Sequence, residues 1–245
     1  MQKIGGRWVL LGAGLALWGA VGLAQTASKP AGHWQGKIQI PDHELGIAVD
    51  LAQSPKGAWI GSMSVTGSTS IDVPLAGIAI EGTAVRFAAS LPQRASFDGH
   101  LSADGSSLSG TASSAAGEAP FQLTRNGEAN VSVPPPSSAL SKEFEGAWEG
   151  TIDADGKVRR VALKLSPAAG GTAMAILIAV DQGNLEIPVS TVTIKDKQLQ
   201  LEARAVSGTY RGTLGESGDI AGEWSQGPTR VPLTFKRGSS EAKKP

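Results

Sequence analysis

The stretch Ala147-Trp148-Glu149-Gly150 repeats His33-Trp34-Gln35-Gly36 from the first half of the chain. Farther along, Leu185-Glu186-Ile187-Pro188-Val189 repeats Ile71-Asp72-Val73-Pro74-Leu75 at the same interval. A third pair matches Tyr210-Arg211-Gly212-Thr213-Leu214 with Phe97-Asp98-Gly99-His100-Leu101. Two copies of one pattern in one order predict two small domains of the same fold.

Apolar and polar residues alternate within each copy. In the second copy Val161, Leu163 and Leu165 recur at every second position, and Arg160 and Lys164 occupy the opposite phase. This period of two predicts strands with one buried and one solvated face. Turn-forming pairs separate such segments at Asp104-Gly105, Asp155-Gly156 and Gly170-Gly171. We find no amphipathic helix after the N-terminal segment.

Eight short strands are expected in each copy. In the second they span roughly 147–153, 158–166, 172–181, 185–194, 197–206, 208–215, 219–226 and 229–237. Sequential antiparallel strands with short turns favour an eight-stranded meander barrel of the lipocalin or avidin kind, which leaves no open edge. A barrel-like sandwich of two sheets is the alternative. The residues expected inside the second domain are Trp148, Ile152, Val161, Leu163, Leu165, Met174, Ile176, Leu199, Leu201, Tyr210, Leu214, Trp224, Leu233 and Phe235.

The N-terminus has the features of a signal peptide. Lys3 and Arg7 precede an apolar run, and Gly22-Leu23-Ala24 supplies small residues, so we expect cleavage after Ala24 and export to the periplasm or the cell exterior. The predicted organisation is a signal peptide at 1–24, a first domain at 32–127, a Pro/Ser linker at 128–143, a second domain at 144–238 and a disordered tail at 239–245. No membrane segment is expected after cleavage.

Composition excludes several classes of function. The chain has no cysteine, which removes disulfides, thiol catalysis and thiolate metal sites. Its 22 basic and 22 acidic residues balance, and without a basic stripe nucleic acid is not an expected partner.

The second copy resembles a β-rich module that precedes the catalytic domain of some secreted bacterial α/β-hydrolases. The matching pieces are Trp148-Glu149-Gly150, the alternating Val161, Leu163 and Leu165, Asp181-Gln182-Gly183, Ile187-Pro188-Val189, Tyr210–Leu214, Ile220–Gly227 and Pro232–Arg237. The first copy departs from this pattern, with Ala112 in place of Trp224 and Ser114 in place of Gln226. The chain has no Gly-x-Ser-x-Gly sequence, so the resemblance implies an accessory module without the hydrolase activity.

Catalytic and metal sites are not indicated. His33 and His100 are out of phase with the apolar residues around them, and His43 lies in a turn, so all three histidines are expected at the surface. Asp181, Glu186 and Glu223 are acid–base candidates by type alone, because nothing in their spacing pairs them. We therefore expect no enzyme, no metal and no cofactor.

Two strand ends carry the candidate binding residues. Asp181 and Gln182 end one expected strand, and Trp224 and Gln226 end another. One hypothesis makes them, together with Trp148, a rim that binds a ligand or partner at a barrel mouth. The alternative is structural: the polar residues satisfy turn backbone, and the two tryptophans plug the core.

The segment Ala173–Val180 is apolar in both phases. If Met174, Ile176, Ile178 and Val180 face inward, then Ala173, Ala175, Leu177 and Ala179 face outward and need a cover. The other repeat, a second copy of the chain in a homodimer, or a partner protein are the candidate covers.

Three functions follow in order of preference. The first is a non-enzymatic binding or accessory module that engages a protein or a small apolar molecule at a barrel mouth. The second is a structural or interaction protein of the cell envelope. The third is an accessory partner of a separate α/β-hydrolase.

Overall fold

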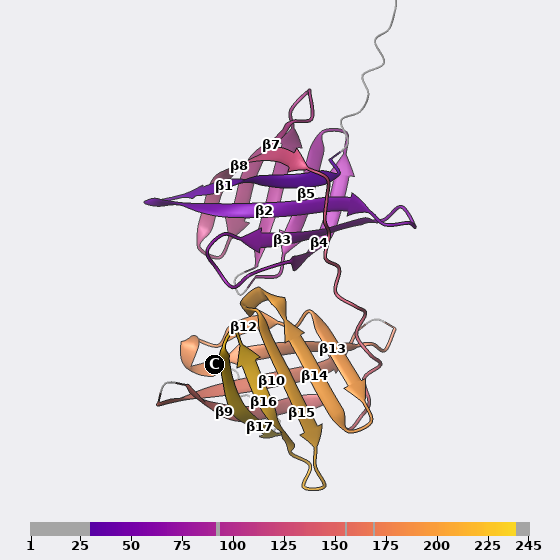
Figure 1. Cartoon of the computed structure of the whole chain (residues 1–245), viewed down its shortest axis with the longest axis vertical. Coiled ribbons are helices and arrows are strands. Elements are labelled where there is room, and N and C mark those ends of the chain that lie inside the picture. The colour runs from indigo at the N-terminus through magenta and orange to yellow at the C-terminus, as the bar shows by residue number, and fades with distance from the viewer. Residues whose placement is uncertain (1–29, 92–93, 155, 169, 239–245) are drawn as a thin grey trace, which may run out of the picture.

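The computed structural model describes residues 30–91, 94–154, 156–168 and 170–238. The chain forms two β units, one above the other along the long axis of the molecule (Figure 1). The expected signal peptide at 1–24 and the expected tail at 239–245 lie outside the described residues.

The first unit is a closed barrel of eight antiparallel strands. Each strand pairs with the next along the chain, and β1 pairs with β8 to close the ring. The strands are β1 Gly32–Ile40, β2 His43–Gln53, β3 Trp59–Val65, β4 Val73–Glu81, β5 Ala84–Ala89, β6 Ala95–Leu101, β7 Ser107–Ser114 and β8 Gly117–Gly127. This part of the barrel prediction is confirmed.

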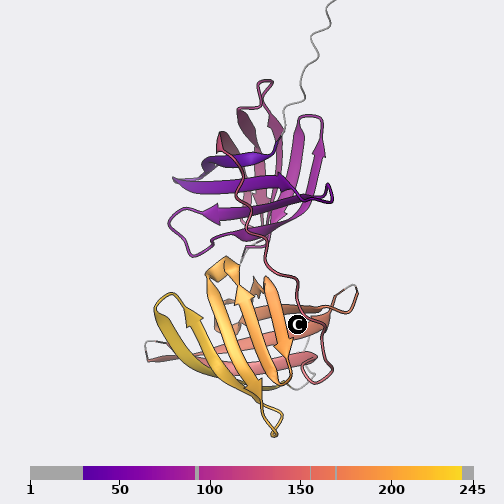
Figure 2. The ribbon, with the colours of Figure 1, turned by 45° about the vertical axis from the view of Figure 1, so that its right-hand side comes forward.

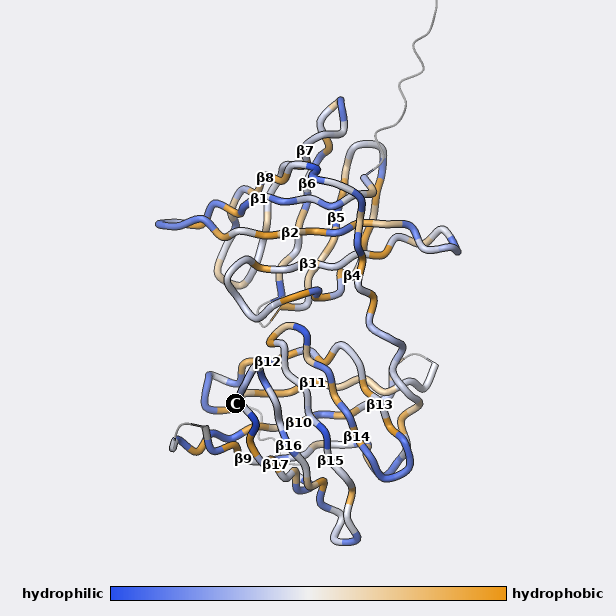
Figure 3. Tube along the Cα trace, in the orientation of Figure 1, coloured by the Kyte–Doolittle hydropathy of each residue, from blue (hydrophilic) through white to orange (hydrophobic). Residues whose placement is uncertain are grey.

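Aromatic rings fill the first barrel. Phe87 and Phe97 stack with their centroids 4.7 Å apart, and Phe121 meets Phe97 edge-on at 5.4 Å. All three side chains are buried. Figure 3 shows the alternation of polar and apolar residues along these strands that puts one side of each in the core.

The second unit is a nine-stranded antiparallel sheet. In spatial order its strands run β12, β11, β10, β9, β17, β16, β15, β14 and β13. Their bounds are β9 Gly146–Ala154, β10 Lys157–Pro167, β11 Ala173–Ala179, β12 Leu185–Pro188, β13 Thr191–Lys195, β14 Gln198–Ala203, β15 Gly208–Leu214, β16 Ile220–Gln226 and β17 Thr229–Arg237. Two 3₁₀ turns, η1 Val180–Gln182 and η2 Arg204–Val206, connect strands at one end.

The strand expected at 185–194 is divided into β12 and β13, and this raises the count from eight to nine. Between the two, the backbone N–H of Val189 donates to the oxygen of Ala175 on β11, and that of Ser190 donates to Glu202 on β14. The chain thus changes partner within two residues. Pro188 directly precedes this step, and it has no N–H to continue a ladder.

The segment that joins the units takes part in the second sheet. Ser138 N–H donates to Val192 O on β13 at 2.8 Å, and Ser138 O accepts from Ala173 N–H on β11 at 2.7 Å. The Ser137 and Ser138 hydroxyls also accept bonds from the backbone of β13. Ser138 therefore bridges β11 and the edge strand β13, and Ser137 is bonded to β13 beside it.

The two units repeat one tryptophan arrangement. Trp34 and Trp148 are fully buried, and each indole Nε1 donates at 2.9 Å to a carbonyl four residues earlier, that of Pro30 or Phe144. A guanidinium from the last strand lies over each ring; that of Arg237 is 4.5 Å from the Trp148 centroid. Each tryptophan plugs one end of its core, with its only polar atom satisfied.

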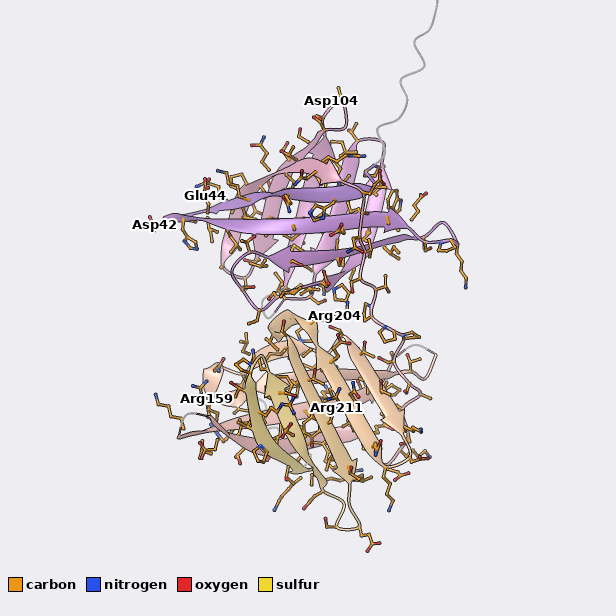
Figure 4. All side chains as sticks on the ribbon, in the orientation of Figure 1. Asp42, Glu44, Asp104, Arg159, Arg204 and Arg211 are labelled. Atoms are coloured by element: carbon orange, nitrogen blue, oxygen red, sulfur yellow. The ribbon has the colours of Figure 1, made fainter. Side chains whose placement is uncertain are left out.

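The units meet at a small polar interface between the β3–β4 loop and η2 (Figures 1 and 2). Ser70 Oγ donates to Ala205 O at 2.7 Å, and Ser207 Oγ donates to Thr69 O. Arg204 Nη1 reaches Asp72 O, at 3.3 Å, and Ser132 O in the joining segment, at 2.7 Å. Figure 4 shows Arg204 on the side of the second unit that faces the first.

The expected orientation of β11 was wrong. Ala173, Ala175 and Leu177 are buried in the core, and Met174 is 48% exposed. Register decides this, because Leu165 and Leu163 on β10 stand opposite Ala175 and Leu177 and cross-strand partners share a face. Ala179 stands opposite Val161 in the same phase and is half-buried. The four residues expected to face outward therefore face the core. Met174 and Ile176, which were expected inside, lie outside the core.

Candidate functional site

A cavity of about 570 Å³ opens at one mouth of the second unit. Several strands converge there: the ends of β9, β10 and β11, the short β12, and the ends of β16 and β17 that meet at Gly227-Pro228. The volume lies within the range of about 300–1,000 Å³ that is typical of small-molecule sites.

Apolar side chains make up most of the wall. Those that point from the strands into the cavity continue the core-facing rows of the sheet. They are Ile152, Val161, Leu177, Leu185, Ile187, Trp224, Val231 and Leu233, and Val206 of η2 lines the cavity beside them. Leu177 and Leu233 are buried and form the deep part, whereas most of the others are half-buried and therefore accessible from the mouth.

The structure brings four of the five candidate binding residues together. Asp181, Gln182, Trp224 and Gln226 all line this cavity, although they come from η1 and from the end of β16. Trp148 does not line it. That indole is fully buried and bonded to Phe144 O, so it is a core residue.

Trp224 forms part of the wall because its neighbour on β15 is a glycine. A Cβ added at Gly208 would stand 2.1 Å from Cζ2 of the indole, so the ring lies directly against the Gly208 backbone. Gln226, two residues farther along the same face, donates from Nε2 to Val206 O at 2.8 Å. This bond ties β16 to η2, the turn that contacts the first unit.

Asp181 is held in an ion pair at the rim. Arg160 donates to it three times: from the backbone N–H at 2.7 Å, from Nε at 2.9 Å and from Nη2 at 2.6 Å. The side-chain hydrogen bond from Arg160, followed by the backbone bond, lowers the pKa of Asp181 below its ordinary value. The carboxylate is thus occupied in fixing η1 against β10.

Sequence reasoning did not assign several residues of this site, Arg159 and Thr69 among them. Arg159 on β10 lines the cavity, and its phase with Val161 and Leu163 was a signal available in the sequence. Thr69 also lines the cavity, although it belongs to the β3–β4 loop of the first unit. No sequence pattern indicates that contact, since it depends on how the two units dock.

The first unit differs at the position that corresponds to Trp224. Ala112 stands opposite Phe97 in the first unit, and Trp224 stands opposite Tyr210 in the second. The strand register therefore agrees with the sequence alignment that places Ala112 at the position of Trp224. Ala112 is buried, and the rings of Phe87, Phe97 and Phe121 occupy the barrel interior.

The first unit carries instead an open groove of about 830 Å³ over β4 to β8. Two of its charged side chains are paired: Arg86 Nε donates to Asp98 Oδ2 at 3.0 Å, and Arg86 Nη1 also lies 3.8 Å from Glu81 Oε2.

The three histidines lie on β1, β2 and β6 of the first unit. His43 and His100 are exposed, and His33 is half-buried, with its Nδ1 3.0 Å from Asp50 Oδ1. Within residues 30–91, 94–154, 156–168 and 170–238, no group of three or more His, Cys, Asp or Glu side chains is placed to hold a metal ion. No helix in the described part of the chain is long and apolar enough to cross a membrane.

No model of a known protein family matches this chain, and no curated protein matches it. Solved structures that show similarity include the following two. One is a protein of unknown function from the DUF3598 family of Nostoc punctiforme, 12% identical over 87% of this chain and 97% of that one, with a TM-score of 0.26. The other, from Bacteroides fragilis and provisionally assigned to the outer membrane, is 10% identical over 85% and 96%, also with a TM-score of 0.26. These values assign neither a fold nor a function to the chain.

Proposed function

We propose that this chain is an exported, non-enzymatic binding protein that holds a small apolar molecule at the mouth of its second domain. In this proposal the chain consists of two tandem barrel domains, the first supporting the second, and it works in the periplasm or outside the cell. The cavity of about 570 Å³ carries the proposal. It combines an apolar wall with a few polar groups at the rim, which is the usual composition of a small-molecule site.

The apolar surface supplies the affinity in this proposal. Half-buried Ile152, Ile187 and Val231 face the cavity beside the indole of Trp224. Covering them with an apolar ligand stabilises the complex by about 0.8 kcal/mol for each methylene removed from water, before the cost of association. The rim amides of Gln182 and Gln226 then provide orientation.

Two further observations support a role for the first domain. Thr69 forms part of the cavity wall, and the loop that carries it is hydrogen-bonded to η2. The first domain has its own interior filled by aromatic rings. It therefore acts as a support that completes the wall of its neighbour.

Filling the cavity tests the proposal. Ala179→Trp places a large side chain at a half-buried wall position, and Ala221→Trp places the same side chain on the exposed face of β16 as a control. We expect calorimetry to detect binding of decan-1-ol by the wild type and by Ala221→Trp, and none by Ala179→Trp. Equal binding by all three proteins, or by none, would contradict the proposal.

A further inference from the structure

Arg159 occupies an unusual position for a charged residue. It lies on β10 opposite Ile152, in the same phase as Val161 and Leu163, which face the core. Alternation along a strand therefore directs Arg159 to the inner side of the sheet, at the rim of the cavity that it lines. Figure 4 shows Arg159 at the left of the second unit, near β9 and β10.

The other charges of the cavity neutralise each other. Three charged residues line it: Arg159, Arg160 and Asp181. Arg160 and Asp181 form the three-bond ion pair described above. The Arg159 side chain has no hydrogen bond or ion pair among the described residues, and the rest of the rim is uncharged. The mouth therefore has one uncompensated positive charge.

An apolar cavity with one available guanidinium selects a particular chemistry. Arginine stays charged at all physiological pH values and presents parallel N–H donors that match the two oxygens of a carboxylate. An ion pair at the rim of a cavity is partly solvated, so it contributes little binding free energy. The apolar wall supplies most of the affinity, and the ion pair makes the site select a ligand with a carboxylate.

We propose that the second domain binds a small amphiphile with an apolar body and a carboxylate head, and that Arg159 is the residue that recognises the head. The body lies along Leu177, Val231 and Trp224, and the carboxylate meets the guanidinium at the mouth. This inference rests on the proposed function, because it assigns a ligand class to the same cavity.

Two probes of equal chain length separate the head from the body. Decanoate and decan-1-ol differ only in their polar group. The difference between their affinities for the full chain therefore gives the contribution of the carboxylate to binding. Calorimetry at neutral pH and low salt provides both affinities. We expect decanoate to bind about tenfold more tightly, in line with a hydrogen bond to a charged group at a solvated position. The preference should shrink as added salt screens the pair.

Variants assign the preference to Arg159. Arg159→Gln should bring decanoate to the affinity of decan-1-ol and leave the alcohol unchanged, and Arg159→Lys should keep part of the preference. Arg230→Gln is the matched control, because it removes the same charge from an exposed position of β17 that does not line the cavity. It should bind both probes like the wild type.

The outcomes distinguish the two proposals. If the wild type binds both probes equally, or if Arg159→Gln keeps the preference for decanoate, the carboxylate assignment is overturned while the apolar site stands. If neither probe binds the wild type, both the assignment and the proposed function are overturned.

Discussion

The indole of Trp224 lies against the backbone of Gly208, so closely that an added Cβ would stand 2.1 Å from Cζ2 of the ring. Gly208 has no positive φ to restrict it, so alanine is compatible with the local backbone. We expect Gly208→Ala to displace the indole, change the cavity wall and weaken binding of decan-1-ol at least several-fold. A second change, Trp224→Val, removes the clash, and a double-mutant cycle of binding free energies should therefore show strong coupling. Additive effects would mean that the contact does not shape the site.

Arg204 links the second unit to Asp72 of the first unit and to Ser132 of the joining segment. Arg204→Ala removes these charge-assisted bonds, and we expect a loss of about 1–3 kcal/mol in the free energy of domain docking. Small-angle scattering should then show a larger radius of gyration. Arg211→Ala is the control, because Arg211 is exposed on β15 and contacts only Gln200 among the bonds described for it. Identical scattering from both variants would argue against a docked pair.

Tyr210 is the single tyrosine of the chain, and its hydroxyl donates to the carbonyls of Ile220 and Leu233. Burial raises the pKa of this phenol above its ordinary value. Its contribution to stability is therefore complete below pH 10 and is lost as the pH rises beyond that value. Tyrosinate absorbance should appear only as the protein unfolds in alkali; absorbance that rises near pH 10 in folded protein would contradict this.

The Tyr210→Phe variant measures the same hydroxyl at neutral pH. It leaves two buried carbonyl oxygens without this donor, and we expect the free energy of unfolding to fall by about 1–3 kcal/mol. Chemical denaturation with urea provides the measurement, and the gap between wild type and variant should narrow in alkali.

Asp104 accepts bonds from the Ser102 hydroxyl and from the backbone and hydroxyl of Ser106 in the β6–β7 turn. These bonds, led by that from Ser102, lower the pKa of Asp104 to about 2 from the ordinary 3.8. The associated stability is present above pH 3.8 and is lost as the pH falls through 2. NMR titration of the carboxyl carbon should give this low midpoint in the wild type. A midpoint near 3.8 would show that the turn does not hold the carboxylate.

Adjacent residues of β11 face opposite sides of the sheet, so substitutions at Ala175 and Met174 should differ in their effect on stability. Ala175 is 3% exposed and faces Leu165, so Ala175→Met overfills the core and should cost about 1–3 kcal/mol of unfolding free energy. Met174 is 48% exposed, and Met174→Ser should change that free energy by no more than about 0.5 kcal/mol. Thermal unfolding of the two variants compares them directly; a larger loss for Met174→Ser would reverse the assigned faces.

Alternation and repetition were enough to predict the all-β class and the closed first barrel. They also placed most strand boundaries of the second unit, because most period-two segments end near a Gly or Pro residue. The break between β12 and β13 was not predicted. Pro188 marks it in the sequence, but the change of partner depends on the two neighbouring strands, which no local pattern specifies.

The candidate site was likewise predicted only in part from the sequence. Asp181, Gln182, Trp224 and Gln226 were identified because they lie at expected strand ends, and the second sheet brings the ends of β11 and β16 to one cavity. The orientation of β11 failed because both phases of Ala173–Ala179 are apolar, so only register against β10 separates them. Thr69 comes from the first unit and lines a cavity of the second, and no pattern within one repeat predicts such a contact.

Native mass spectrometry tests the central claim most directly. The chain is expressed with its own N-terminal segment, recovered gently from a bacterial periplasm, and compared with its Ala179→Trp variant. The proposed site predicts a small-molecule adduct on the wild type that disappears on denaturation and is missing from the variant. A bare wild-type mass that stays bare in excess decan-1-ol and excess decanoate would contradict a ligand site at the mouth of the second domain.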